Sequence, residues 1–160
     1  MSFVKSPPAW GDNPLPATLP APMMSAPGPS PAPEVTALPR LLYVEDNAIN
    51  MLIVEELVHK RGGIALSGAE TVAEGLRMAA ALQPRLILVD MQLPDGDGHE
   101  LLQALRADPA TAHIPCVALS ANAMPEDVRR ASEAGFADYW TKPIDFKVFL
   151  AGLDAYYGAA

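Results

Sequence analysis

The sequence has one cysteine, few basic residues and no long hydrophobic run, and each shortage excludes a class of protein. A single cysteine, Cys116, cannot form an internal disulfide, which fits a cytoplasmic protein in a reducing compartment. Only 11 lysines and arginines stand against 19 aspartates and glutamates, so too few cations are present to neutralise the phosphates of a nucleic acid. The apolar runs are far shorter than the roughly 20 residues that cross a bilayer, so we expect no membrane partner either.

Residues 1–39 lack the composition of a folded segment. They hold 11 of the 17 prolines and only three charged residues. Prolines at this density are incompatible with a helix, a central strand or a signal peptide. We therefore predict a disordered, extended proline-rich tether over residues 1–39, followed by one folded domain over residues 40–160, where the composition changes abruptly.

Residues 40–160 alternate strand and helix signals five times. The strand signals cover residues 41–44, 64–67, 86–89, 114–119 and 136–140. The helix signals begin near Asn47, Thr71, Gly98, Pro125 and Asp145. In the first helix the apolar residues at helical spacing are Ile49, Leu52, Ile53 and Leu57, and the last helix is expected to turn Val148, Phe149 and Leu153 inward. Five such units predict an α/β fold, a doubly wound parallel sheet of order 2-1-3-4-5 with five helices on its two faces.

Polar residues that follow the strands are the candidate functional residues. In chain order they are Glu45, Asp46, Asp90, Ser120 and Lys142. In the sheet order above the crevice lies between strands one and three, so three carboxylates should gather there with a hydroxyl and an ammonium beside them. Repulsion among the carboxylates favours a bound divalent cation, and their hard oxygen ligands suit Mg²⁺. Such a site has the groups needed to accept a phosphoryl group, with Asp90 as the nucleophile.

Four motifs at these strand ends resemble those of receiver domains of two-component signalling. They are Tyr43–Asn47, Val89–Gly98, Leu119–Met124 and Tyr139–Pro143. The resemblance extends from Arg40 to about Tyr157, with all four motifs in order and at matching spacing. It implies a flavodoxin-like fold and a cytoplasmic phosphoprotein, a response regulator or phosphorelay module that carries an aspartyl phosphate.

The resemblance also implies a role for each matching residue at the crevice. Asp90 would accept the phosphoryl group. Mg²⁺ would be bound directly by Asp46, Asp90 and the backbone carbonyl of Gln92, and through water by Glu45. Ser120 would donate a hydrogen bond to a phosphoryl oxygen. Asp95 and Asp97, in the same loop as Gln92, are assigned to ordinary loop chemistry rather than to the metal.

The resemblance also implies roles for two residues in how an output partner would detect phosphorylation of the domain. Lys142 would form an ion pair with the phosphoryl group, and its bond to Pro143 is expected to be cis. Tyr139 would be an aromatic switch that turns inward when Ser120 moves, repacking the surface of helix four, strand five and helix five where an output partner would bind. Trp140 is expected on the opposite side of the strand, with a structural role.

Two classes of function follow from these residues. The first is a receiver that takes its phosphoryl group from a histidine kinase or a histidine phosphotransfer protein, and that is no enzyme beyond assisting its own phosphorylation and dephosphorylation. The motifs look most like C-terminal receivers of hybrid sensor histidine kinases, and a free-standing regulator is the second possibility. The second class is an aspartate-nucleophile phosphatase, but such enzymes usually carry an acid two residues after the nucleophile, where this chain has Gln92.

Overall fold

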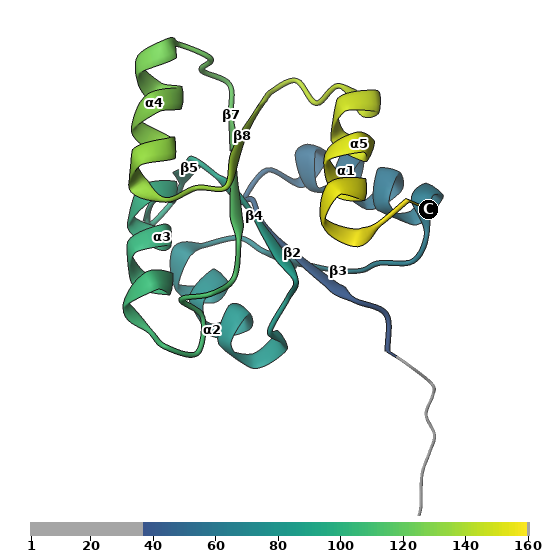
Figure 1. Cartoon of the computed structure of the whole chain (residues 1–160), viewed down its shortest axis with the longest axis horizontal. Helices are drawn as coiled ribbons and strands as arrows, with labels where there is room; N and C mark the ends of the chain where they lie inside the picture. The colour runs from purple at the N-terminus through teal and green to yellow at the C-terminus, as the bar shows by residue number, and fades with distance from the viewer. Residues whose placement is uncertain (1–36, 160) are drawn as a thin grey trace, which may run out of the picture. The chain divides into compact units, whose positions relative to one another are not determined.

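A five-stranded parallel sheet organises the part of the chain that the computed structural model describes, residues 37–159 (Figure 1). In spatial order its strands are β3 (Ala65–Ala69), β2 (Arg40–Val44), β4 (Leu86–Asp90), β7 (Cys116–Ser120) and β8 (Asp138–Thr141). Counted along the chain, these five strands are the second, first, third, fourth and fifth of the sheet, so the predicted order 2-1-3-4-5 is confirmed. Every neighbouring pair is parallel. The predicted tether lies outside the described residues, apart from its last three.

Helices cover both faces of this sheet, as a doubly wound fold requires. They are α1 (Ala48–Arg61), α2 (Val72–Leu82), α3 (Gly98–Ala107), α4 (Pro125–Ala134) and α5 (Phe146–Tyr157). Helices α1 and α5 lie on one face, and α2, α3 and α4 on the other (Figure 1). Within residues 37–159 no helix combines the length and the apolar character needed to cross a bilayer.

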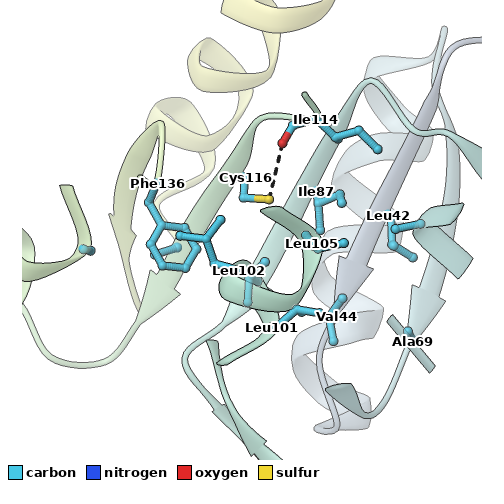
Figure 2. Close-up of a cluster of buried hydrophobic side chains, with 14 residues drawn as sticks. Leu42, Val44, Ala69, Ile87, Leu101, Leu102, Leu105, Ile114, Cys116 and Phe136 are labelled. Atoms are coloured by element: carbon cyan, nitrogen blue, oxygen red, sulfur yellow. Dashed lines mark hydrogen bonds between the residues drawn. The ribbon is translucent and has the colours of Figure 1, made fainter. Parts of the chain in front are cut away.

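The core consists of two clusters, one on each face of the sheet. In β2, Leu42 and Val44 point into the cluster under α2, α3 and α4, whereas Leu41 and Tyr43 point into the cluster under α1 and α5. This is the two-residue alternation of a strand that is buried on both sides. Figure 2 shows the first cluster, in which the Cys116 thiol donates to the carbonyl of Ile114. Cys116 is therefore a buried residue of the core.

The loop after β4 contains structure that the sequence did not predict. Strands β5 (Gln92–Leu93) and β6 (Gly96–Asp97) form a short antiparallel ribbon. The Asp95 carboxylate accepts hydrogen bonds from the amides of Val72 (2.7 Å) and Ala73 (3.1 Å), and so caps α2 from outside that helix. The Asp97 carboxylate caps α3. Both aspartates are thus engaged at helix ends, as expected for residues outside a metal site.

Some helix faces and strand limits differ from the predictions. Leu57 is buried as expected, but Ile49 and Leu52 are 68% and 56% exposed, because α1 buries Val54 and Val58 in their place. The apolar residues of α1 lie on several of its faces, so their spacing alone could not identify the face that is buried. Val148, expected to face inward, is 59% exposed, because it lies about 100° around α5 from its neighbour Phe149. Strands β7 and β8 each begin two residues later than predicted.

The buried side chain of Arg61 links α1 to α5 at the end of the sheet opposite the predicted site. The Arg61 side chain at the end of α1 is only 5% exposed, and its Nε donates to the Asp154 carboxylate of α5 at 2.9 Å. Its other nitrogens donate to the carbonyls of Gly62 and Gly158. The Tyr157 hydroxyl donates to the carbonyl of Arg40 at 2.7 Å. These bonds fix α5 to α1 and β2 at the end of the sheet away from the predicted site.

Candidate functional site

A cavity of about 670 Å³ opens at the carboxyl edge of the sheet, where β2, β4, β7 and β8 end. Its lining includes six of the predicted site residues, Glu45, Asp46, Asp90, Gln92, Ser120 and Lys142. Tyr139 borders a neighbouring cavity of about 220 Å³, whose lining also contains Ser120. The parallel topology therefore gathers at one edge side chains as far as 97 residues apart in the sequence.

Strand alternation decides which face of the sheet each site residue shares. Tyr43, Leu88 and Trp140 all belong to the cluster under α1 and α5. Two residues after each of them comes a site residue, in turn Glu45, Asp90 and Lys142. Since alternate residues along a strand point to the same side, these two carboxylates and the ammonium emerge together at the edge of that face.

The carboxylates of Glu45, Asp46 and Asp90 form a compact acidic cluster. Each offers an oxygen, and these oxygens lie within 4.8 Å of one another. Glu45 and Asp90 are buried, whereas Asp46 is exposed at the mouth of the cavity. An all-oxygen set with one side open to water is the donor chemistry that suits Mg²⁺, which keeps several of its waters when bound. The residues present therefore fit a divalent cation.

Burial and mutual repulsion separate the pKa values of the two buried carboxyls. Burial, together with the hydrogen bond and charge of Glu45, raises the pKa of Asp90 to about 6. Burial alone would also raise the pKa of Glu45, but its hydrogen bonds with Asp90, Lys142 and Tyr43 lower it overall. Glu45 is thus the first of the pair to ionise, and Asp90 is the one that holds a proton longer.

Lys142 balances the charge of both buried carboxylates. Its Nζ lies 2.8 Å from Glu45 Oε1 and 3.2 Å from Asp90 Oδ1. Burial by itself would lower the pKa of Lys142, but these two carboxylates raise it overall, so the side chain stays cationic. The Lys142–Pro143 bond is cis, as predicted. The amide of Gln92 also donates to Asp90 Oδ1, at 3.3 Å.

Ser120 and Tyr139 belong to the other face of the sheet and meet at Asn122. Tyr139 packs against the cluster under α2, α3 and α4, whereas Trp140 packs on the opposite side, as predicted. Ser120 Oγ accepts a hydrogen bond from the Asn122 amide at 3.1 Å. The Tyr139 hydroxyl donates to the Asn122 carbonyl. One residue therefore connects the hydroxyl at the cavity with the aromatic ring.

Two residues at this site received no role from the sequence. Asn122 lies within the Leu119–Met124 motif, but nothing in its residue type indicates that its backbone contacts both Ser120 and Tyr139. The sequence predicts Tyr43 only as a strand residue, yet its hydroxyl donates to Glu45 Oε1 at 2.8 Å. The available signal was its position two residues before Glu45, which places both side chains on one face of β2.

Comparison with known proteins agrees with this geometry. The response regulator receiver domain model matches residues 41–154. The polar-differentiation response regulator DivK of Brucella anthropi is 35% identical over 125 residues, which cover 75% of this chain and 97% of that protein.

Solved structures of similar proteins have the same fold. The receiver domain of a Pseudomonas aeruginosa sensor histidine kinase, with a magnesium ion in its active-site cleft, has a TM-score of 0.69 at 28% identity and covers 77% of this chain and 100% of its own. A response regulator from Chloroflexus aurantiacus has a TM-score of 0.70 at 24% identity, over 76% and 98% of the two chains, and so supports the fold alone. This chain belongs to the response regulator receiver domain family of two-component signalling.

Proposed function

We propose that Asp90 is the phosphoacceptor of this receiver domain and takes a phosphoryl group from a phosphohistidine. The observation that carries the proposal is the surroundings of this one carboxylate. Asp90 lies at the floor of an open cavity, with Lys142 Nζ at 3.2 Å and two further carboxylates within 4.8 Å. A negatively charged group can enter there only where cations offset the carboxylates, which Lys142 and a divalent cation would do.

The chemistry is an in-line displacement at phosphorus. An Asp90 oxygen forms the new bond to phosphorus, the bond from phosphorus to the imidazole nitrogen breaks, and its electron pair leaves with the imidazole. Lys142 neutralises one phosphoryl oxygen, and the Ser120 hydroxyl donates to another. Later, a water attacks the phosphorus of the aspartyl phosphate, the bond from phosphorus to the Asp90 oxygen breaks, and inorganic phosphate leaves with Asp90 restored as a carboxylate.

Mg²⁺ is the cation we propose for this site, where it would offset the charge that builds up on the phosphoryl oxygens. Asp46, Asp90 and the carbonyl of Gln92 would bind it directly, and Glu45 would bind it through water. The support is the set of three carboxylates that converge on one point. The similar Pseudomonas aeruginosa receiver, whose structure holds magnesium in its cleft, is consistent with this choice.

The proposed donor is a histidine kinase or a histidine phosphotransfer protein in the cytoplasm. The output would be read on the surface of α4, β8 and α5, which adjoins Tyr139. We further propose that the domain derives from a hybrid sensor kinase, for which the similarity to a histidine kinase receiver is the support. A phosphatase is not favoured, because Gln92 occupies the position where such enzymes usually carry an acid.

Intact-mass measurement after incubation with a small phosphodonor and Mg²⁺ tests the proposal. One added phosphoryl group is expected on the wild type and none on Asp90→Asn. Asp95→Asn is the matched control, because its carboxylate lies in the same loop but caps α2, and it should be phosphorylated like the wild type. Phosphorylation of Asp90→Asn, or of the wild type without divalent cation, would contradict the assignment.

A further inference from the structure

The buried hydroxyl of Tyr43 donates a hydrogen bond to Glu45, one of the carboxylates of the site. Tyr43 is fully buried in β2, within the cluster under α1 and α5. Its hydroxyl donates to Glu45 Oε1 at 2.8 Å. An apolar side chain would fill the same core position without any polar atom to satisfy, so packing does not explain the hydroxyl.

Glu45 is held at both of its oxygens. Oε1 accepts from the Tyr43 hydroxyl and also from Lys142 Nζ, both at 2.8 Å. Oε2 accepts from the Asn47 amide at 3.2 Å. Because Glu45 is almost fully buried, each of these bonds replaces water that the carboxylate cannot reach.

The two donors to Oε1 differ in how freely they can move. Lys142 has a long, flexible side chain, and in the proposed function it turns to a phosphoryl oxygen on Asp90. If it were the only partner of Oε1, that move would leave a buried carboxylate oxygen without a donor, which is costly. Tyr43 is fixed by its packing and is too far inside the core to leave.

We propose that Tyr43 is a positioning residue of the phosphoacceptor site, whose hydroxyl remains the partner of Glu45 Oε1 while Lys142 transfers to the phosphoryl group. The inference rests on the proposed function and deepens it. Tyr43 touches neither the phosphoryl group nor the cation, and acts through Glu45 and Lys142. Without its hydroxyl, Glu45 would hold Lys142 more firmly, and an incoming anion would have to compete for it.

Tyr43→Phe tests the proposal, because it removes the hydroxyl and keeps the ring. Affinities for Mg²⁺ alone, and for beryllofluoride at saturating Mg²⁺, are measured by titration calorimetry. Beryllofluoride binding should weaken about tenfold, the effect of losing one hydrogen bond to a charged group, while Mg²⁺ binding changes much less. Tyr157→Phe is the matched control, since it removes a hydroxyl that bonds Arg40 at the other end of the sheet, and it should match the wild type.

The difference between the two ligands separates positioning from loosened packing. Equal loss of affinity for Mg²⁺ and beryllofluoride would mean that Tyr43→Phe merely disorders the cavity, and unchanged beryllofluoride binding would mean that the hydroxyl has no role. Either result overturns the inference. A wild type that binds no beryllofluoride would instead overturn the proposed function itself.

A measurement on the wild type keeps the inference testable if Tyr43→Phe folds poorly. The ¹³C shift of the Tyr43 ring carbon that bears the oxygen reports the hydrogen bond of its hydroxyl. That shift should stay nearly constant when beryllofluoride is added to the Mg²⁺-bound protein, since the bond to Glu45 persists. A change to the value of an unbonded phenol would overturn the inference.

Discussion

At the scale of the residue, the Asp90 carboxylate, the proposed acceptor, is buried where its negative charge costs stability. Burial and the adjacent Glu45 raise the pKa of Asp90 to about 6 in the folded protein, from 3.8 for an unperturbed aspartate. Between these values the folded state binds the proton more tightly than the unfolded chain does. Stability therefore falls as the pH rises from 3.8 to about 6, and the full cost remains above that range.

Asp90→Asn should accordingly stabilise the metal-free protein at neutral pH. The amide removes the buried charge, so the free energy of unfolding at pH 7.5 in EDTA should rise by roughly 1–3 kcal/mol. The gain should shrink as the pH falls below 6 and vanish only well below 3.8, where the wild-type carboxyl is protonated in both the folded and the unfolded states. Thermal melts across this range measure it, with the exposed Glu55→Gln as control. A gain that is absent at pH 7.5, or that does not depend on pH, would contradict the buried-charge explanation.

At the scale of the element, the neighbouring parallel strands β7 and β8 contain Ser120 and Tyr139, the two residues of the proposed switch. Ala118 is paired with Tyr139 in the register of these strands, and Ser120 with Thr141. Because Ser120 and Tyr139 both bond the backbone of Asn122, we expect a shift of Ser120 toward a phosphoryl group to disturb the hydrogen bond of the Tyr139 hydroxyl.

Beryllofluoride should therefore change the environment of residues outside the cavity as well as those that line it. In two-dimensional NMR, large shifts are expected at Ser120, at Tyr139 and along α4, because we expect the Tyr139 ring to rotate into the space that Ser120 vacates. The ligand acts through its different affinity for two existing conformations. The shifts along α4 should shrink in Tyr139→Ala. Shifts confined to Asp46, Asp90 and their loops would mean that beryllofluoride binding does not change the conformation of Tyr139 or α4.

The bond between α1 and α5 gives a second prediction at this scale. Asp154→Asn should lower the free energy of unfolding by about 1–2 kcal/mol, because the Arg61 guanidinium is buried and loses the carboxylate of Asp154 as its partner. Glu133→Gln breaks the exposed pair with Arg129 on α4 and should cost less than about 0.5 kcal/mol. Chemical denaturation compares the two. Equal effects would show that burial of Arg61 adds nothing to the pair.

The elements also show what sequence reasoning could and could not find. The gathering of Glu45, Asp90 and Lys142 followed from apolar runs that each end in a polar residue, which is a local signal, combined with the strand order of a doubly wound sheet. The exposed side chains of α1 and α5 were not predicted, because helical spacing does not select among several apolar stripes. Nor could the cap of α2 by Asp95 be foreseen, since donor and acceptor lie 23 residues apart and only the fold brings them together.

At the scale of the whole molecule, the described domain should be independent of the chain that precedes it. The Pro39 carbonyl accepts a hydrogen bond from the Ala65 amide, so a deletion that respects the fold removes residues 1–36. Their scarce charge and many prolines predict that Tm is unchanged and that beryllofluoride affinity is retained. A fall in Tm of more than roughly 5 °C, on the order of 1–2 kcal/mol, would show that the segment packs on the domain.

The link between Arg61 and Asp154 also bears on how the chain folds as it is made. Residues of the cluster under α2, α3 and α4 all lie between Leu42 and Phe136, whereas the opposite cluster needs Phe149 and Leu153 from the last helix. On the ribosome, Arg61 emerges 93 residues before the carboxylate that neutralises it. One side of the sheet can therefore close during synthesis, while the side that carries Tyr43 and Asp90 must wait for α5 to leave the exit tunnel.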